Sequence, residues 1–342
     1  MTYKKNTFIF GGLILLLLAA FGVNLSLGSV PIPIEEIFSS LFGGQTDRES
    51  WQYIIWNYRL PKALTAILIG GGLSLSGLLM QTLFRNPLAG PFVLGVSSGA
   101  SLGAALLIMG VSLLGGLGAG YLTSDLSLIV ASGLGSFLVL VIVLVVATRL
   151  KDAMALLIVG LMFGSITAAL VTVLSYFSQA EQLQKYIFWS YGSIGNLSWS
   201  QVGLLTLFVL AGIGISIGLL KALNAFLLGE NYAVSMGIST KRSRNWIILA
   251  TGLLAGGITA FAGPIAFIGL AVPHLARQLL GTQDHRVLLP GVLLYGGILM
   301  LVCDVIAQLP FSAYVLPINA ITSLVGAPVV IWLLLRRNRI LF

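Results

Sequence analysis

Residues 126–148 read LSLIVASGLGSFLVLVIVLVVAT, a run that contains no Asp, Glu, Lys or Arg. About 20 apolar residues suffice for an α-helix to cross the ~30 Å hydrocarbon core of a bilayer. Strands of a membrane β-barrel would instead alternate in segments of ~10 residues, and Leu138–Val146 does not alternate. Three further charge-free runs cover residues 63–84, 153–180 and 305–335. The sequence therefore predicts an all-α, polytopic membrane protein.

The composition of the whole chain agrees with this class. Of the 342 residues, 58% are hydrophobic and 8% are charged, whereas soluble globular proteins carry about 25% charged residues. The net charge of +8 would suggest nucleic acid as a partner in a soluble protein. Here the basic residues lie in short stretches beside apolar runs, which indicates membrane orientation and contact with lipid, and no nucleic acid. Cys303 is the only cysteine and is interpreted as a packing residue.

The basic clusters also allow the membrane crossings to be counted, because they mark the cytoplasmic side. Successive clusters on one side must be separated by an even number of spans, and each interval here has room for two. Five intervals predict ten transmembrane helices with both termini in the cytoplasm. The first apolar run is interpreted as a retained span, since no A-x-A site closes it as in a signal peptide. The clusters are Lys4/Lys5, Arg85, Arg149/Lys151, Lys221 with Lys241/Arg242/Arg244, Arg277/Arg286 and Arg336/Arg337/Arg339.

One interval, Asn245–Ala276, is uncharged and short for two spans. At least one of its spans should be short or broken, with the break at Gly263-Pro264 and Pro273, because proline removes a backbone donor and clashes with the preceding turn. A broken helix at membrane depth is tolerated where it faces protein or a water-filled cavity. Gly263–His274 is thus a candidate element of a transport path, and a kinked packing helix is the equal alternative. Clusters of small residues such as Gly70–Gly72 favour close helix packing.

Three sets of motifs are more specific than composition. The first set comprises RLPK (59–62), GLLMQ (77–81), NPLAGP (86–91) and LGVSSGA (94–100). The second is GENYAVSMGIS (229–239). The third comprises AGPIAFIGLAVPH (262–274), DHRVLLP (284–290), LP (316–317) and GAPV (326–329). Together, across nearly the whole chain, these motifs resemble the permease family of bacterial ABC importers for iron chelates (siderophores), haem and cobalamin.

The resemblance implies one transmembrane permease domain over residues 1–342 in the bacterial inner membrane. It implies a homodimer or close heterodimer with the translocation path on its two-fold axis. Two cytoplasmic ATPase subunits and an extracytoplasmic substrate-binding protein would complete the importer. The residues agree that the ATPase is another chain, because no G-x-x-x-x-G-K-[ST] phosphate loop occurs. Nor is there an H-E-x-x-H motif or a metal cluster, so we expect a transport subunit with no catalytic residues, no cofactor and no metal site.

The second motif has a physical interpretation beside the family one. Gly229 and Gly237 permit sharp turns at either end of a short helix, and Lys221 and Lys241 flank the segment on the predicted cytoplasmic side. Such a helix could fit a groove on a soluble partner; an ordinary connecting loop is the alternative. In the family this loop is the coupling helix that contacts the ATPase. The implied coupling residues are Gly229, Glu230, Asn231, Tyr232, Ala233, Val234, Ser235, Met236 and Gly237.

Arg59 and Lys62 are basic residues on the predicted outer side, against the orientation rule, as are Arg48 and Lys185. Snorkelling to lipid phosphates would explain them. The resemblance offers docking instead, in which Arg59 and Lys62 pair with acidic residues of the binding protein. In relatives a further basic residue can follow the Asp304-Val-Ile-Ala motif, where this chain has Gln308.

Asp304 is the one carboxylate inside an otherwise apolar span, and such groups are functional candidates by default. A structural hydrogen bond with Gln308, four residues on, is an equal alternative. His274 has no partner ligands in the sequence, so a metal site there is not expected. The candidate residues for the translocation path are Ser97, Ser98, Gly99, Gly263, Pro264 and Asp304.

A secondary transporter driven by an ion gradient is the rival class, but such carriers usually need carboxylates or histidines buried in the bundle. In this sequence only Asp304 is such a group, and a secondary transporter would have no use for the coupling segment. The sequence indicates the class of transporter more clearly than it indicates the transported substrate. An iron chelate is expected as the commoner cargo of the family, with cobalamin as the alternative.

Overall fold

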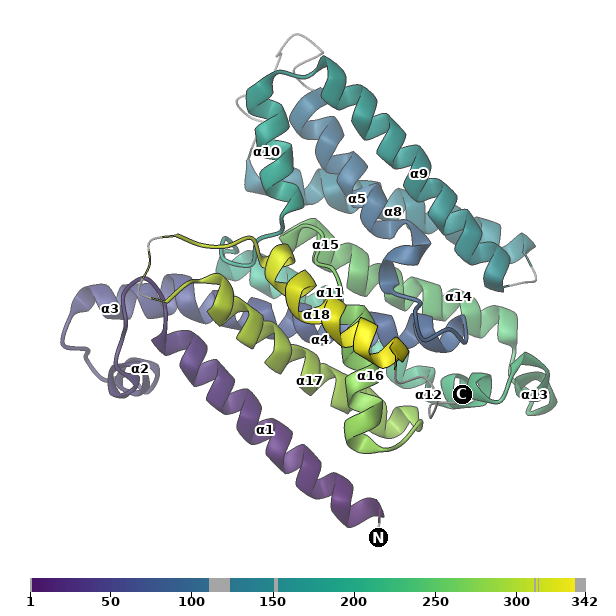
Figure 1. Ribbon diagram of the computed structural model, residues 1–342, viewed down its shortest axis with the longest axis horizontal. Helices are drawn as coiled ribbons and strands as arrows, with labels where there is room; N and C mark the ends of the chain where they lie inside the picture. The colour runs from purple at the N-terminus through teal and green to yellow at the C-terminus, as the bar shows by residue number, and fades with distance from the viewer. Residues whose placement is uncertain (1, 111–123, 151–152, 311, 313, 336–342) are drawn as a thin grey trace. The chain divides into compact units, whose positions relative to one another are not determined.

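The computed structural model describes residues 2–110, 124–150, 153–310, 312 and 314–335, and these residues form helices and connections without a strand. Figure 1 traces the helices along the chain. The first half contains α1 (Thr2–Ser26), α2 (Ile34–Leu41), α3 (Glu49–Ile54), η1 (Ile55–Arg59), α4 (Leu60–Leu83), η2 (Pro91–Leu94), α5 (Val96–Ala105), η3 (Leu106–Gly110), α8 (Asp125–Arg149) and α9 (Ala153–Phe177). The second half contains α10 (Ala180–Ser190), α11 (Trp199–Gly218), α12 (Leu220–Leu227), α13 (Glu230–Ser235), α14 (Thr240–Thr251), η4 (Gly252–Gly256), α15 (Gly257–Ala262), α16 (Ile268–Leu280), α17 (His285–Ala307) and α18 (Ile318–Leu335).

Within the described residues, seven helical stretches are long and apolar enough to cross a membrane. They are Asn6–Ser26, Glu49–Leu83, Asp125–Arg149, Ala155–Phe177, Trp199–Gly218, Thr240–Ala262 and His285–Ala307. Two shorter apolar helices, Val96–Gly110 and Ile318–Trp332, accompany them. The predicted all-α membrane class is thus confirmed. The count of ten spans and the side of each terminus stay predictions, in part because Lys151, Arg336, Arg337 and Arg339 lie outside the described residues.

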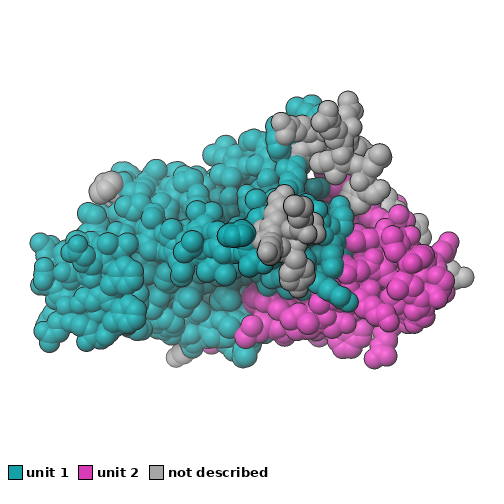
Figure 2. Space-filling view, turned by 90° about the horizontal axis from the view of Figure 1, so that it is seen from below, with its two compact units in different colours: residues 1–75, 193–207, 266–342 teal, residues 76–192, 208–265 magenta. Residues whose placement is uncertain are grey.

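The chain divides into two compact units, coloured separately in Figure 2. The first comprises residues 1–75, 193–207 and 266–342; the second comprises residues 76–192 and 208–265. In the first unit α1 packs on α17, and α16 packs on both α17 and α18. In the second unit α5 packs on α8 and α9, and α8 also contacts α14 and α15.

Small residues bring helix backbones together in both units. A side chain at Gly70 of α4 would collide with the backbone carbonyl of Gly296 in α17, and one at Gly296 with that of Gly70. In the second unit, Gly99 of α5 and Gly135 of α8 oppose each other in the same way. Close approach of this kind is the usual role of glycine between membrane helices. The packing role predicted for the small-residue clusters is therefore confirmed at these positions.

The N-terminal apolar run forms the continuous helix α1, and its retention as a span stays a prediction. Near its end, Asn24 and Leu25 are almost completely buried, and the Asn24 amide donates to the Leu301 carbonyl and to Asp304 of α17.

The uncharged interval Asn245–Ala276 is broken, as its glycine and prolines predict, but at one place only. Helix α15 ends at Ala262, and α16 begins at Ile268. Gly263 adopts φ +71° at the end of α15, and Pro264 follows in the non-helical connection. Pro273, which was expected to contribute to the break, does not: it lies inside α16, which continues to Leu280. Proline is tolerated within helices of membrane proteins where neighbouring groups satisfy the freed carbonyl.

Candidate coupling segment and polar network

A buried polar network joins the end of α1, the start of α4 and the end of α17, all within the first unit. The side chain of Asp304 is 2% exposed, and its Oδ1 lies 3.0 Å from the ammonium of Lys62, which is 18% exposed. The other carboxylate oxygen accepts hydrogen bonds from Asn24 Nδ2 at 2.8 Å and from Gln308 Nε2 at 2.7 Å. Three groups therefore neutralise and solvate a carboxylate that would otherwise be costly to bury. Sequence reasoning missed Asn24, although a polar residue in the last turn of an apolar helix was a signal.

Arg59 is the second buried cation of this region, at 9% exposure. Its guanidinium donates to three backbone carbonyls, those of Leu25, Ser26 and Val30. The last carbonyls of a helix have no partner within the helix, and Arg59 provides partners for those at the end of α1. The guanidinium thereby also holds the turn that follows α1, of which Ser29, Val30 and Pro31 are exposed.

The structure therefore gives both predicted docking residues internal partners. Lys62 is paired with Asp304, and Arg59 is bonded to the backbone, so neither side chain stands free at the surface. The sequence-level expectation that Asp304 bonds to Gln308 is met by the 2.7 Å hydrogen bond. The placement of Asp304 favours a structural role over direct contact with a transported molecule.

The predicted coupling segment forms the six-residue helix α13 in the second unit, where it packs against α12 and α14. The two glycines at its ends adopt left-handed conformations, with φ +108° at Gly229 and +75° at Gly237. Of the helix, only Ala233 is buried. Tyr232, Val234 and Met236 expose 48%, 59% and 46% of their surface. The short helix bounded by glycine turns, expected from the sequence, is present, and apolar side chains of the helix and of its C-cap residue Met236 are exposed.

The predicted path residues of α5 lie at helix contacts in the second unit. Ser97 and Gly99 are buried, and Ser98 is half-buried. A side chain at Gly99 would meet the Gly135 carbonyl and the Val139 side chain of α8. Space for a side chain at Gly164 of α9 is limited by the Ser98 hydroxyl at 3.4 Å. Gly99 thus allows α5 to pack closely on α8, and a role of Ser97, Ser98 and Gly99 in the transport path stays a prediction.

The residues around the break at Gly263 contact an earlier and a later part of the sequence. A side chain at Gly263 would stand 2.6 Å from the backbone carbonyl of Trp189. Three residues later, the amide of Ala266 donates to Asn319 Oδ1 of α18 at 3.0 Å. Pro264 between them is half-buried. The connection is thus fixed by specific contacts, and its left-handed Gly263 admits no other residue without strain.

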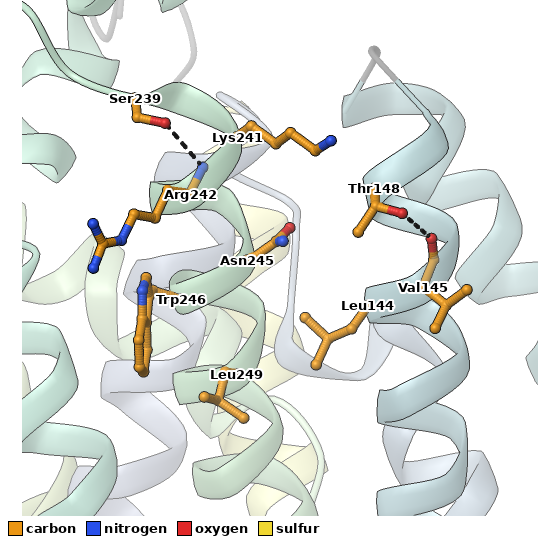
Figure 3. A pocket seen from close by; sticks show the side chains of 9 residues that line it. All are labelled: Leu144, Val145, Thr148, Ser239, Lys241, Arg242, Asn245, Trp246 and Leu249. Atoms are coloured by element: carbon orange, nitrogen blue, oxygen red, sulfur yellow. Dashed lines mark hydrogen bonds between the residues drawn. The ribbon is translucent and has the colours of Figure 1, made fainter.

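A groove lies between the C-terminal part of α8 and the N-terminal part of α14. In the sequence, α14 directly follows α13. Its volume is about 550 Å³. Figure 3 shows Leu144 on α8 and Leu249 on α14, with Lys241 extending across the mouth of the groove toward Thr148. The sequence had not indicated this groove. The complete lining is Leu144, Val145, Thr148, Ser239, Lys241, Arg242, Asn245, Trp246 and Leu249.

Comparison with known proteins identifies relatives over most of the chain. Residues 15–336 match the model of the FecCD transport family. The vitamin B12 import system permease protein BtuC of Salmonella typhi is 39% identical over 292 residues, which cover 84% of this chain and 85% of the relative. The corresponding protein of Salmonella newport gives the same identity and coverage.

Solved structures agree with the sequence matches. An inward-facing metal-chelate type ABC transporter superposes with a TM-score of 0.84 at 31% sequence identity, over 96% of this chain and 99% of its own. PsaBC from Streptococcus pneumoniae, in complex with Fab, superposes with a TM-score of 0.50 at 14% identity, over 88% and 95%. The second match concerns the fold alone.

Proposed function

Because the chain belongs to the FecCD transport family and is a permease of an ABC importer, we propose that it conducts vitamin B12 or a closely similar metal chelate across the bacterial inner membrane. The observation that supports vitamin B12 as the cargo is the 39% identity to vitamin B12 permeases over 84% of the chain. The iron chelate expected from the sequence becomes the second candidate, supported by the likeness to a metal-chelate type transporter at 31% identity.

The proposed assembly is a homodimer or close heterodimer of this chain with two cytoplasmic ATPase subunits and an extracytoplasmic binding protein. Each chain would be one permease domain with ten spans and both ends in the cytoplasm. The seven long and two shorter apolar helices of the described residues are candidates for nine of these ten spans. The chain itself would not hydrolyse ATP, since its sequence lacks a phosphate loop.

Coupling to the ATPase is assigned to α13 and its two glycine turns, residues Gly229–Gly237. The exposed apolar side chains Tyr232, Val234 and Met236 support this assignment, because exposed apolar side chains on a short helix suit contact with a groove of a partner. Exposed Lys221 and Lys241 nearby favour the cytoplasmic side for this end of the molecule.

For the outer end we propose an indirect role of the two internal cations in docking. Arg59 would shape the exposed turn Ser29–Pro31 that meets the binding protein, and Lys62 would act with Asp304 to hold α4 against α17. Of the predicted path residues, Gly263 and Pro264 stay candidates, because they lie in a helix break. Ser97, Ser98, Gly99 and Asp304 would act by positioning helices.

Two measurements test the cargo. The binding protein that co-purifies with the permease is denatured, and the released ligand is identified by mass spectrometry. Vesicles containing the whole importer are then offered labelled vitamin B12, a ferric siderophore or haem. Release and ATP-dependent uptake of vitamin B12 would support the first candidate. Uptake of the siderophore or of haem without vitamin B12 would replace it with the second.

A further inference from the structure

The groove between α8 and α14 has an apolar body. Leu144 and Val145 line it from α8, and Trp246 and Leu249 line it from α14. Val145 and Trp246 keep 54% and 41% of their surface exposed. Both α8 and the stretch beginning with α14 are candidate membrane spans. A groove with such a lining favours hydrocarbon over water as its occupant, because water gains nothing from an apolar lining.

The other end of the groove is cationic. Lys241 and Arg242 stand in the first turn of α14, and both are exposed. In Figure 3 Lys241 reaches toward Thr148 of α8, whereas the guanidinium of Arg242 is directed away from α8. Arg149, the last residue of α8, is also exposed. No acidic side chain is among the residues that line the groove. The N-terminus of α14 adds the positive end of its helix dipole.

A third feature concerns Asn245, which lines the groove one turn below Lys241. Its Oδ1 is buried and has no hydrogen-bond partner. A buried acceptor without a donor costs free energy, so this atom favours an occupant that brings a hydroxyl or ammonium group. The side chain points from α14 into the space facing α8 (Figure 3).

We propose that this groove is a binding site for one anionic phospholipid of the phosphatidylglycerol type. The phosphate pairs with Lys241, and Arg242 adds to the local positive potential. An acyl chain lies along Leu144, Val145 and Leu249, and a headgroup hydroxyl donates to Asn245 Oδ1. An apolar groove that ends in cations and an orphan acceptor matches these three parts of one amphiphile.

The site adjoins the proposed coupling segment, because Ser239, the N-cap of α14, follows Gly237 by only two residues. A lipid bound in the groove would therefore stabilise the N-terminal turn of α14. The lipid proposal itself depends on the groove and its cations, and holds whichever substrate the permease carries.

Trp246 provides a probe at the edge of the groove, because it lines the groove while its ring lies on the same side of α14 as Arg242 (Figure 3). The complete importer is placed in nanodiscs of phosphatidylcholine that contain a small fraction of lipid brominated on its acyl chains, either phosphatidylglycerol or phosphatidylcholine. Fluorescence of the Trp246→Phe variant is subtracted, so that only quenching of Trp246 is compared. At ~1 kcal/mol per cation near a lipid surface, Lys241 should give phosphatidylglycerol about a fivefold preference over phosphatidylcholine.

The variant Lys241→Gln should remove most of this preference, and Arg242→Gln should remove less. The matched control is Lys221→Gln, because Lys221 is an exposed cation of the same predicted side on α12 and does not line the groove. It should leave the preference unchanged. Inorganic phosphate, compared with chloride at equal ionic strength, should also leave it unchanged.

Four outcomes would overturn the proposal. Equal quenching by both lipids would exclude headgroup recognition. An equal loss in Lys221→Gln would reduce the effect to general surface charge. Displacement by inorganic phosphate would indicate a plain anion site. An absence of Trp246 quenching by either lipid would mean that a protein, such as a second copy of the chain, covers the groove.

Discussion

Lys62 at the start of α4 forms an ion pair with Asp304 in the last turn of α17, with 3.0 Å between Nζ and Oδ1. A carboxylate near the C-terminus of a helix is disfavoured by the helix dipole, and burial adds a desolvation cost. Lys62, Asn24 and Gln308 together offset both. The ion pair therefore fastens two membrane helices and makes α1 part of the same contact.

Removing Lys62 should be more damaging than removing Asp304. The variant Lys62→Met leaves a carboxylate that is 2% exposed without its counterion, and loss of one partner of a buried pair costs about 3–5 kcal/mol. Asp304→Asn leaves a lysine that is 18% exposed and can reach water. Thermal unfolding of the purified chain should rank wild type first, then Asp304→Asn, then Lys62→Met.

The double variant Lys62→Met/Asp304→Asn provides the control, because it removes both charges. It should be more stable than Lys62→Met alone. A double variant that is as unstable as the sum of the two single changes would show that the pair is not coupled.

Arg59→Lys should not preserve the function of Arg59. A planar guanidinium serves several carbonyls at once, whereas an ammonium acts as a point charge. We expect Arg59→Lys to lose about 1–3 kcal/mol of stability and to weaken binding of the substrate-binding protein. Arg48→Lys is the matched control, since Arg48 is a neighbouring exposed cation. An unchanged dissociation constant and unfolding temperature in Arg59→Lys would remove the proposed role in docking.

Gly237→Val should uncouple ATP hydrolysis from uptake. Gly237 has φ +75° and no atom within 4 Å of the position where a Cβ would stand, so the substitution strains the backbone without a collision. A β-branched residue is strongly disfavoured in this conformation, whereas Gly237→Asn should retain much of the transport because asparagine visits it. The ratio of transported substrate to ATP hydrolysed is the measurement.

Gly214→Val is the control for added bulk, because Gly214 has equally open space but carries no positive φ. Normal expression with an unchanged coupling ratio in Gly237→Val would count against the coupling assignment.

Gly70→Val should destabilise the first unit. Its side chain would collide with the backbone of Gly296, which no change of rotamer relieves. Overpacking of this kind typically costs 1–3 kcal/mol or more. Gly12→Val of α1 adds the same atoms where nothing lies within 4 Å. Thermal unfolding should separate the two variants; equal stability would contradict the observed helix contact.

The sequence predicts the class of the fold well because membrane burial imposes long charge-free runs. It also predicts the position of the break at Gly263, since a positive φ selects glycine, and the short helix between Gly229 and Gly237. It wrongly includes Pro273 in this break, because a single proline inside a helix is compatible with continued packing. Local pattern alone does not decide between a kink and a helix end.

The polar network was the least predictable part. Asp304 and Gln308 are four residues apart, so their hydrogen bond follows from helical spacing. The partners Asn24 and Lys62 lie far away in sequence, and only tertiary packing brings them to Asp304. For the same reason, Arg59 and Lys62 look like free outer cations in the sequence but have internal partners in the fold.

The central claim is that this chain is a conduit driven by ATP hydrolysis in a partner subunit. Uptake of labelled vitamin B12 into vesicles that contain the chain, its ATPase and its binding protein tests it most directly. The vesicles should accumulate vitamin B12 in a way that requires ATP, is abolished by vanadate and is unaffected by a protonophore. Uptake that proceeds without ATP and collapses with the proton gradient would contradict it.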